Sequence, residues 1–196
     1  MRSVFIMITM DDIIRDYHPT LRKIAEKVEF PLSADLKQLS ADMIEFLKNS
    51  QDPEMAEKYK LRAGVGIAAP QLNISKQIFA VHIPGEGESE DEDFSLVMIN
   101  PKVIRHSVKQ TALQDGEGCL SVDEVYVGLV PRHKRITVEY YDVDGNKHQE
   151  KFTGYPAIVI QHEMDHLNGI LFFDHINEEQ PFQTNDRLEI FEDSLD

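Results

Sequence analysis

The segment "QHEMDHLNG", residues 161–169, places two histidines four residues apart, with a glutamate directly after the first. On a helix, residues i and i+4 lie on nearly the same side, so the imidazoles of His162 and His166 can bind one metal ion together. Glu163 would lie beside that ion, where a carboxylate moves protons instead of binding the metal. The H-E-x-x-H pattern therefore predicts a metal-dependent hydrolytic site.

The residues before this segment, Ala157 to Ile160, are all apolar and indicate a helix that is buried on more than one side. Burying two imidazoles together with Glu163 and Asp165 would cost several kcal/mol if these groups had no partners. A divalent cation offsets that cost directly. The alternative is that the two histidines are ordinary surface or core residues, because so short a pattern also arises by chance. The burial argument favours the metal.

The residues leave the third metal ligand open. The longer protease pattern H-E-x-x-H-x-x-G-x-x-H is met at Gly169 but ends on Phe172, which cannot bind a metal. Cys119 follows Gly116 and Gly118, whose lack of a side chain permits a close backbone approach, yet a lone cysteine is more often a small buried hydrophobe. The other candidates are Asp174, His175 and an acidic residue of "INEEQPF", residues 176–182.

The first part of the chain predicts helices within residues 11–50. The segment "HPTLRKIAEKV" opens with Pro19 near a first helical turn, and "SADLKQLSADMIEFLKNS" repeats apolar residues at helical spacing behind Ser33. A β-strand is predicted at 77–83 ("QIFAVHI"), and the acidic segment "PGEGESEDEDFS", residues 84–95, is predicted to be a solvent loop.

The second part predicts a hairpin followed by the buried helix. "RITVEYYDVDGNKHQEKF" alternates on both sides of Asp144-Gly145, the dipeptide that type I′ turns prefer. A strongly apolar helix follows, from about Pro156 to Leu167, and ends at Asn168-Gly169. Many strands and few helices indicate an α+β fold, with several small antiparallel or mixed sheets around the central helix that carries H-E-x-x-H.

Length and composition limit the possible functions. The 196 residues suit one domain, with residues 1–10 expected to form a poorly ordered extension. No run of about 18 apolar residues is present, which excludes a membrane-spanning helix. A net charge of −15 disfavours nucleic-acid binding, and the small basic cluster at 132–135 is interpreted as a solvated strand end. The single cysteine excludes an internal disulfide and fits a reducing cytosol.

Three stretches together resemble the signature of the peptide deformylase family: "GVGIAAPQ" at 64–71, "EGCLS" at 117–121 and "QHEMDHLNG" at 161–169. The similarity runs from about Asp11 to Phe173 and is greatest to the longer-loop class common in Gram-positive bacteria. It implies an enzyme that hydrolyses the N-formyl group from the formyl-methionine of nascent polypeptides and releases formate. The chain has Tyr126 where the Gram-negative class carries an arginine, so an arginine clamp on the substrate cannot be carried over.

The resemblance also implies roles for individual residues. The metal ligands would be Cys119, His162 and His166, holding one divalent ion per chain, with iron(II) as the native metal and nickel, cobalt or zinc as substitutes. Glu163 would be the acid–base group. The oxyanion would be bound by the backbone N–H of Leu120 and the side-chain amide of Gln71, although Gln71 taken alone reads as a turn cap.

The residues expected to contact the substrate, by their position and by the resemblance, are Val65, Gly66, Gly118, Tyr155, Ile158 and Val159. The aliphatic members of this set are equally explained as core residues. Glu117 is expected to pair with Arg132 and to brace the metal ligands from behind.

The expected partners are N-formylmethionyl nascent peptides and, transiently, the ribosome. We expect a cytoplasmic monomer with no DNA or membrane partner. An alternative function is a metal-dependent peptidase that cuts internal peptide bonds, since H-E-x-x-H itself does not exclude one. A third is a non-enzymatic binding module with a structural zinc, which would need a fourth ligand such as His133, Asp174 or His175.

Overall fold

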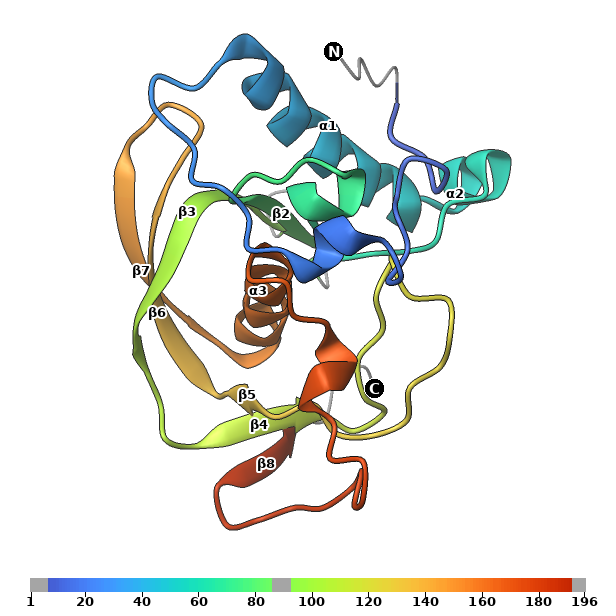
Figure 1. Cartoon of the computed structure of the whole chain (residues 1–196), viewed down its shortest axis with the longest axis vertical. Helices are drawn as coiled ribbons and strands as arrows, with labels where there is room; N and C mark the ends of the chain where they lie inside the picture. The colour runs from blue at the N-terminus through green and yellow to red at the C-terminus, as the bar shows by residue number, and fades with distance from the viewer. Residues whose placement is uncertain (1–6, 86–92, 192–196) are drawn as a thin grey trace.

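A computed structural model of the chain describes residues 7–85 and 93–191. It has the expected α+β architecture, with a five-stranded antiparallel sheet in the order β1-β2-β3-β6-β7 and a three-stranded mixed sheet in the order β5-β4-β8 (Figure 1). The strands are β1 Gly66–Ala68, β2 Ile78–Ile83, β3 Phe94–His106, β4 Gln110–Leu113, β5 Arg132–His133, β6 Arg135–Tyr141, β7 Lys147–Thr153 and β8 Leu188–Phe191. The helices are α1 Ala34–Gln51, α2 Pro53–Tyr59 and α3 Gly154–Leu167, with short 3-10 turns at Pro19–Arg22, Ala69–Leu72 and Phe172–His175.

The five-stranded sheet lies between α1 and α3 and is buried on both faces at β2. Ile78 and Ala80 belong to the core that α1 covers, whereas Phe79 and Val81 belong to the core that α3 covers. This alternation explains why β2 is an unbroken apolar run, because both sides of the strand meet a helix. Figure 1 shows α3 near the centre of the molecule, with β3, β6 and β7 curving around it.

The central helix α3 begins and ends at glycines with positive φ. Gly154 has φ 65°, and Gly169, two residues beyond the last helical residue, has φ 73°. A Cβ at Gly169 would lie 2.7 Å from the carbonyl carbon of Arg22, so only glycine lets the N-terminal segment cross here. Ala25 N–H then donates to the carbonyl oxygen of Leu167 at 2.9 Å. The N-terminal segment thus covers the C-terminal end of the helix that carries both histidines.

The predicted helix in residues 18–28 is wrong beyond its first turn. Only Pro19–Arg22 is helical, as a 3-10 turn, because the following backbone groups bond to other parts of the chain. Glu26 N–H donates to the carbonyl oxygen of Ser75, and Val28 N–H donates to the Asn100 side chain. The second predicted helix is confirmed as α1, and its N-cap is Ser33, whose hydroxyl accepts from Leu36 N–H at 3.3 Å.

The predicted strand and hairpin are confirmed as β2 and as the β6–β7 pair. The turn is not type I′, because Gly145 has a positive φ and Asp144 does not. Instead the Asp142 carboxylate accepts backbone N–H groups from Asp144 and Asn146 and closes a longer loop. Most of the predicted acidic loop, residues 86–92, lies outside the described residues.

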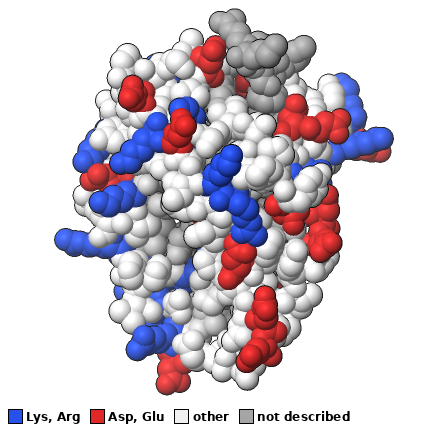
Figure 2. All heavy atoms as spheres, viewed as in Figure 1, with Lys and Arg blue, Asp and Glu red and all other residues white. Residues whose placement is uncertain are grey.

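Residues 7–10 of the expected N-terminal extension belong to the described structure. Ile8 is buried at 1% exposure, and Thr9 donates through its backbone and its hydroxyl to Asp12; residues 1–6 lie outside the described part. Acidic and basic side chains are interspersed over the face in Figure 2. In the described ranges no helix combines the length and apolarity needed to cross a membrane.

Candidate metal centre

Three side chains that can bind a metal meet on one side of α3, two of them from the helix itself. One ligand atom from each of Cys119, His162 and His166 lies within 4.8 Å of the other two, and the thiol sulfur is 3.3 Å from Nε2 of His166. The histidines are one turn apart on α3, and Cys119 comes from the loop between β4 and β5. Two imidazoles and a thiolate suit zinc, iron, nickel or cobalt and leave a position open on a tetrahedral ion. The donor set and its spacing therefore fit a catalytic metal.

The cysteine favours its anionic, metal-binding form. Burial raises the pKa of the Cys119 thiol, but the charge of His166 and hydrogen bonds from both histidines outweigh burial and lower the pKa to about 5. Because the thiolate is the form that ligates metals, the pocket prepares Cys119 for binding. Of the other candidates for a third ligand, Asp174 pairs with Arg22, and His175 contacts Asp165 at 2.7 Å. Glu178 and Glu179 are exposed and do not belong to the ligand group.

Glu163 is a buried carboxylate held beside the ligand cluster. It is 3% exposed, and burial raises its pKa to about 7 against the opposing effect of His162 and His166. Its Oε2 atom is buried without a hydrogen-bond partner among the described residues. On the other side, a Cβ at Gly66 would lie 2.3 Å from Oε1, so the glycine of β1 makes room for this carboxylate. A carboxyl group with a pKa near 7 can both accept and return a proton at neutral pH.

Gln71 both closes a turn and faces the cysteine. Its Oε1 accepts the backbone N–H of Ala68 at 2.8 Å, as a turn cap would. Its Nε2 donates to the Ser121 hydroxyl at 3.1 Å and lies 3.5 Å from the Cys119 sulfur. The amide nitrogen therefore lies beside one of the three ligand atoms, the Cys119 sulfur.

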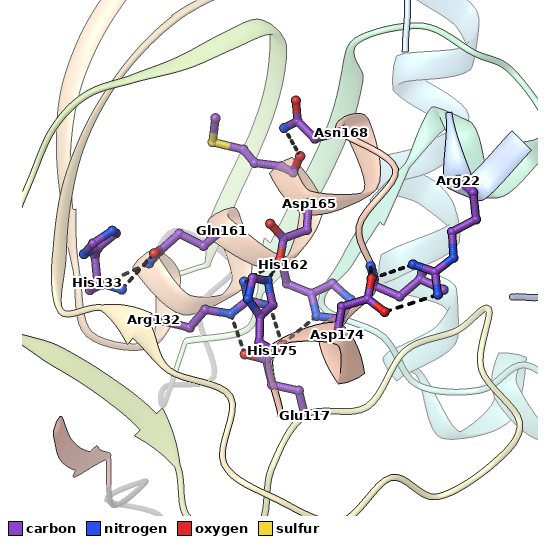
Figure 3. Close-up of polar contacts among 12 residues, drawn as sticks. Arg22, Glu117, Arg132, His133, Gln161, His162, Asp165, Asn168, Asp174 and His175 are labelled. Carbon is purple, nitrogen blue, oxygen red and sulfur yellow. Dashed lines mark hydrogen bonds and ion pairs between the residues drawn. The ribbon is translucent and has the colours of Figure 1, made fainter. Parts of the chain in front are cut away.

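A chain of buried ion pairs supports His162 from behind (Figure 3). Nδ1 of His162 is 2.8 Å from Glu117, whose two oxygens accept from Arg132 at 2.8 and 2.9 Å. Arg132 also pairs with Asp165, which contacts His175. Burial raises the pKa of Glu117, but its hydrogen bonds to Arg132 and His162 prevail and lower it to about 2. Such contacts fix the ring orientation of a metal-binding histidine.

Two sequence predictions are decided by this chain of contacts. The Glu117–Arg132 pair is confirmed. The interpretation of residues 132–135 as a solvated strand end is wrong for Arg132, which is 3% exposed because Glu117 and Asp165 balance its charge. The parts played by Asp165 and His175 were missed, because nothing in their local pattern indicates that they meet Arg132.

A cavity of about 330 Å³ opens onto Cys119, His162 and Glu163. The residues predicted to contact the substrate all line it: Val65, Gly66, Gly118, Tyr155, Ile158 and Val159. Gln71 and Leu120 line it as well, and so do Gln51 and Arg62, which sequence reasoning did not single out. Ile158 and Val159 are 2% and 6% exposed, so they are at once core residues and part of the cavity wall.

Strand β1 forms one edge of the five-stranded sheet and one wall of this cavity. It pairs with β2 on one side, where Gly66 is opposite Val81. The Val65 carbonyl oxygen faces β2 and accepts from His82 N–H, whereas the N–H of Ala68 turns the other way, to Gln71. Gly66 has the parity of Ala68, so its backbone groups point away from β2, at the edge of the sheet that lines the cavity.

Comparisons with known proteins agree with this geometry. The sequence matches the family profile of polypeptide deformylases over residues 10–182. It is 60% identical over 186 residues, 95% of this chain and 100% of the relative, to a peptide deformylase of Latilactobacillus sakei. The chain belongs to the peptide deformylase family. It is thus a metal-dependent hydrolase that removes the N-formyl group from the formyl-methionine of nascent polypeptides.

Other deformylases extend the comparison. The Enterococcus faecalis deformylase is 54% identical over 95% of this chain and all of its own length, in line with the predicted Gram-positive class. Among solved structures, an Acinetobacter baumannii deformylase bound to Met-Ala-Ser matches with a TM-score of 0.66 at 34% identity, covering 84% of this chain and 96% of that one. A plant deformylase matches with a TM-score of 0.71 at 25% identity, covering 91% and 84%. Because the chain belongs to this family, we do not retain the two alternative functions, a peptidase that cuts internal peptide bonds and a non-enzymatic zinc-binding module.

Proposed function

We propose that Cys119, His162 and His166 hold one divalent ion in this deformylase and that Glu163 is its acid–base group. The observation that carries the proposal is the convergence of three ligand atoms within 4.8 Å beside a buried carboxylate oxygen that has no partner among the described residues. A bound ion would act as a Lewis acid toward the formyl group and would make water more acidic. We propose iron(II) as the native ion, as the resemblance to the family implies. Nickel, cobalt or zinc could replace it, because thiolate and imidazole ligands suit all four metals.

Glu163 carries the proton in this proposal. Its carboxylate accepts a proton from water as the water attacks the formyl carbon, and the same oxygen returns it to the leaving amine nitrogen. The pKa of about 7 supports both steps, because neither the acid nor the base form is scarce at neutral pH. The products are formate and a peptide with a free N-terminus.

The developing oxyanion would be bound by the backbone N–H of Leu120 and the Nε2 amide of Gln71. Support comes from the 3.5 Å separation between that amide and the Cys119 sulfur, and from the position of Leu120 directly after the ligand. Donors fixed in advance at such a position are worth more than donors that must reorganise.

The substrate would extend along β1 and place its methionine in the cavity. Backbone groups of Gly66 would pair with the peptide, while Val65, Tyr155, Ile158 and Val159 would surround the methionine side chain. Gly118, which also lines the cavity, would contact the substrate as well. The Acinetobacter baumannii structure holds Met-Ala-Ser, which is the deformylated form of such a peptide. That likeness supports an extended substrate with methionine first.

We further propose a cytoplasmic monomer that contacts the ribosome transiently. Formylated nascent chains are made by ribosomes in that compartment, and all three ligands and the acid–base group come from one chain.

Metal analysis of anaerobically purified protein, paired with turnover of formyl-Met-Ala-Ser, tests the proposal. We expect one metal ion per chain and turnover that disappears on chelation and returns on adding iron(II). Replacing Cys119 by serine or His166 by alanine should lower metal content and turnover together. Full turnover by protein freed of metal would overturn the assignment of these ligands.

A further inference from the structure

The loop that carries Cys119 and Leu120 is held by an arginine from a distant part of the sequence. Nη2 of Arg62 donates to the carbonyl oxygens of Cys119 at 3.2 Å and of Val122 at 3.0 Å. Arg62 precedes β1 and also lines the cavity. One guanidinium group thus joins the wall that would pair with the substrate to the loop that holds the thiolate.

Asp123, four residues after Cys119 in the same loop, fixes that guanidinium group. Its Oδ1 accepts from Nη1 of Arg62 at 2.8 Å, and its Oδ2 accepts from Nε of Arg15 at 2.9 Å. Arg15 is itself held by the carbonyl oxygen of Ile13 at 2.6 Å. The bridge from Arg15 through Asp123 to Arg62 therefore ties the loop to the N-terminal segment as well.

The N-terminal segment also grips the loop through its backbone. Asp16 N–H donates to the carbonyl oxygen of Ser121 at 2.9 Å, and Ile14 N–H donates to the carbonyl oxygen of Gln71 at 2.8 Å. Both residues that supply the proposed oxyanion donors are therefore one peptide unit or less from a contact with this segment. The positions of the two donors, the Leu120 N–H and the Gln71 amide, therefore depend on the contacts that hold the loop and the N-terminal segment together.

These ion pairs are too exposed to serve mainly as stabilising contacts. The side chains of Arg62 and Asp123 are 44% and 64% exposed, and ion pairs of that kind add little to the free energy of unfolding. The planar guanidinium differs from a plain charge in its fixed array of donors, which here meets one carboxylate and two carbonyl oxygens at once. The contribution of the Arg62 guanidinium is therefore to fix the position of the loop that it contacts.

We propose that Arg62 is a positioning residue for deformylation, which sets the Cys119–Leu120 peptide so that the thiolate and the Leu120 N–H are directed into the cavity. This rests on the proposed roles of Cys119 and Leu120. Arg62 takes no part in proton transfer and works through the loop, with Asp123 and Arg15 holding its orientation. Loss of the guanidinium lets the loop move and lowers the rate after substrate has bound.

The test compares Arg62→Met and Arg62→Lys with a control, Lys76→Met, in the metal-loaded enzyme. Lys76 forms a similarly exposed ion pair with Glu26, and neither residue lines the cavity; their side chains are 36% and 72% exposed. The readouts are kcat and KM on formyl-Met-Ala-Ser, the midpoint of thermal unfolding, and hydrogen exchange of the peptide spanning residues 117–123.

For Arg62→Met we expect kcat to fall about tenfold or more with KM changed less than about twofold, because a displaced donor affects the transition state more than binding. Exchange in 117–123 should be faster than in the control, with a similar unfolding midpoint. Arg62→Lys should recover part of kcat, since an ammonium reaches fewer of the acceptors.

A rise in KM at unchanged kcat would overturn the inference and make Arg62 a direct substrate contact. So would a kcat equal to that of Lys76→Met, or unchanged exchange of residues 117–123. Failure of the proposed function is distinguishable: if Cys119→Ser kept the wild-type metal affinity, the ligand assignment would fail whatever the Arg62 variants did.

Discussion

Replacing Gly66 by alanine should displace Glu163 and slow deformylation while leaving the fold intact. The added Cβ would lie 2.3 Å from Oε1, 2.8 Å from the carboxyl carbon and 2.9 Å from Cγ of Glu163. Non-bonded atoms do not approach a Cβ closer than 3.0 Å, so the carboxylate must move by at least 0.7 Å, the difference from 2.3 Å. The side chain is 3% exposed, and the open space beside it is the cavity itself, so a displaced carboxylate would leave its position beside the ligand atoms.

A shift of that size has a calculable effect on rate. Misplacing a reacting group by about 1 Å costs up to about a hundredfold, so we expect kcat for Gly66→Ala to fall by roughly ten- to a hundredfold. In steady-state assays on formyl-Met-Ala-Ser this loss should appear in kcat, with the pH profile altered because the environment of Glu163 has changed.

Gly118→Ala is the matched comparison. It also lies in the cavity wall, but its Cβ would meet no atom within 4 Å, so any effect should fall on KM through the substrate. If Gly66→Ala kept kcat within about twofold of the wild type, the contact between β1 and Glu163 would not govern the reaction and the reasoning would be refuted.

Three further predictions concern Glu163 and the buried ion pairs. Glu163→Gln should lower kcat by at least about a hundredfold yet retain fold and metal, as measured by turnover, circular dichroism and metal analysis; loss of metal instead would make Glu163 a ligand. Arg132→Met leaves the carboxylates of Glu117 and Asp165 buried without their cation and should cost about 3–5 kcal/mol in urea unfolding; a cost under about 1 kcal/mol would contradict this. The pKa of Glu117 is lowered from 4.5 to about 2 on folding, so its contribution is fully present above pH 4.5 and is lost as the pH falls toward 2. Acid unfolding of metal-free protein should show this loss, about 3 kcal/mol, and a stability flat across that range would argue against it.

The parts of the fold that the sequence predicts are those decided locally. The α1 segment carries its own N-cap at Ser33, and β2 is an unbroken apolar run, so both were predicted close to their observed bounds. Residues 23–28 were predicted to be helical but bond to Ser75, Asn100 and Leu167, which lie far away in sequence. Tertiary contacts outweigh intrinsic helix propensity there.

The candidate site divides in the same way. The two histidines and Glu163 follow from a pattern within one helix, whereas spacing alone left Cys119 among several candidates and the family resemblance singled it out. Arg62 gave no signal, and His175 was considered only as a metal ligand, because the contacts of both residues depend on loops meeting in space. The charge of Arg132 suggested a solvated surface, but the carboxylates of buried Glu117 and half-buried Asp165 reverse that expectation.

The most direct test of the account is the absorption spectrum of the cobalt(II)-substituted enzyme, which reports whether a thiolate and two imidazoles hold one ion. We predict one cobalt per chain and a sulfur-to-cobalt charge-transfer band that disappears in Cys119→Ser while the protein stays folded. A wild-type spectrum without that band, or a band that persists in Cys119→Ser, would contradict the central claim that Cys119 joins His162 and His166 around a single metal ion.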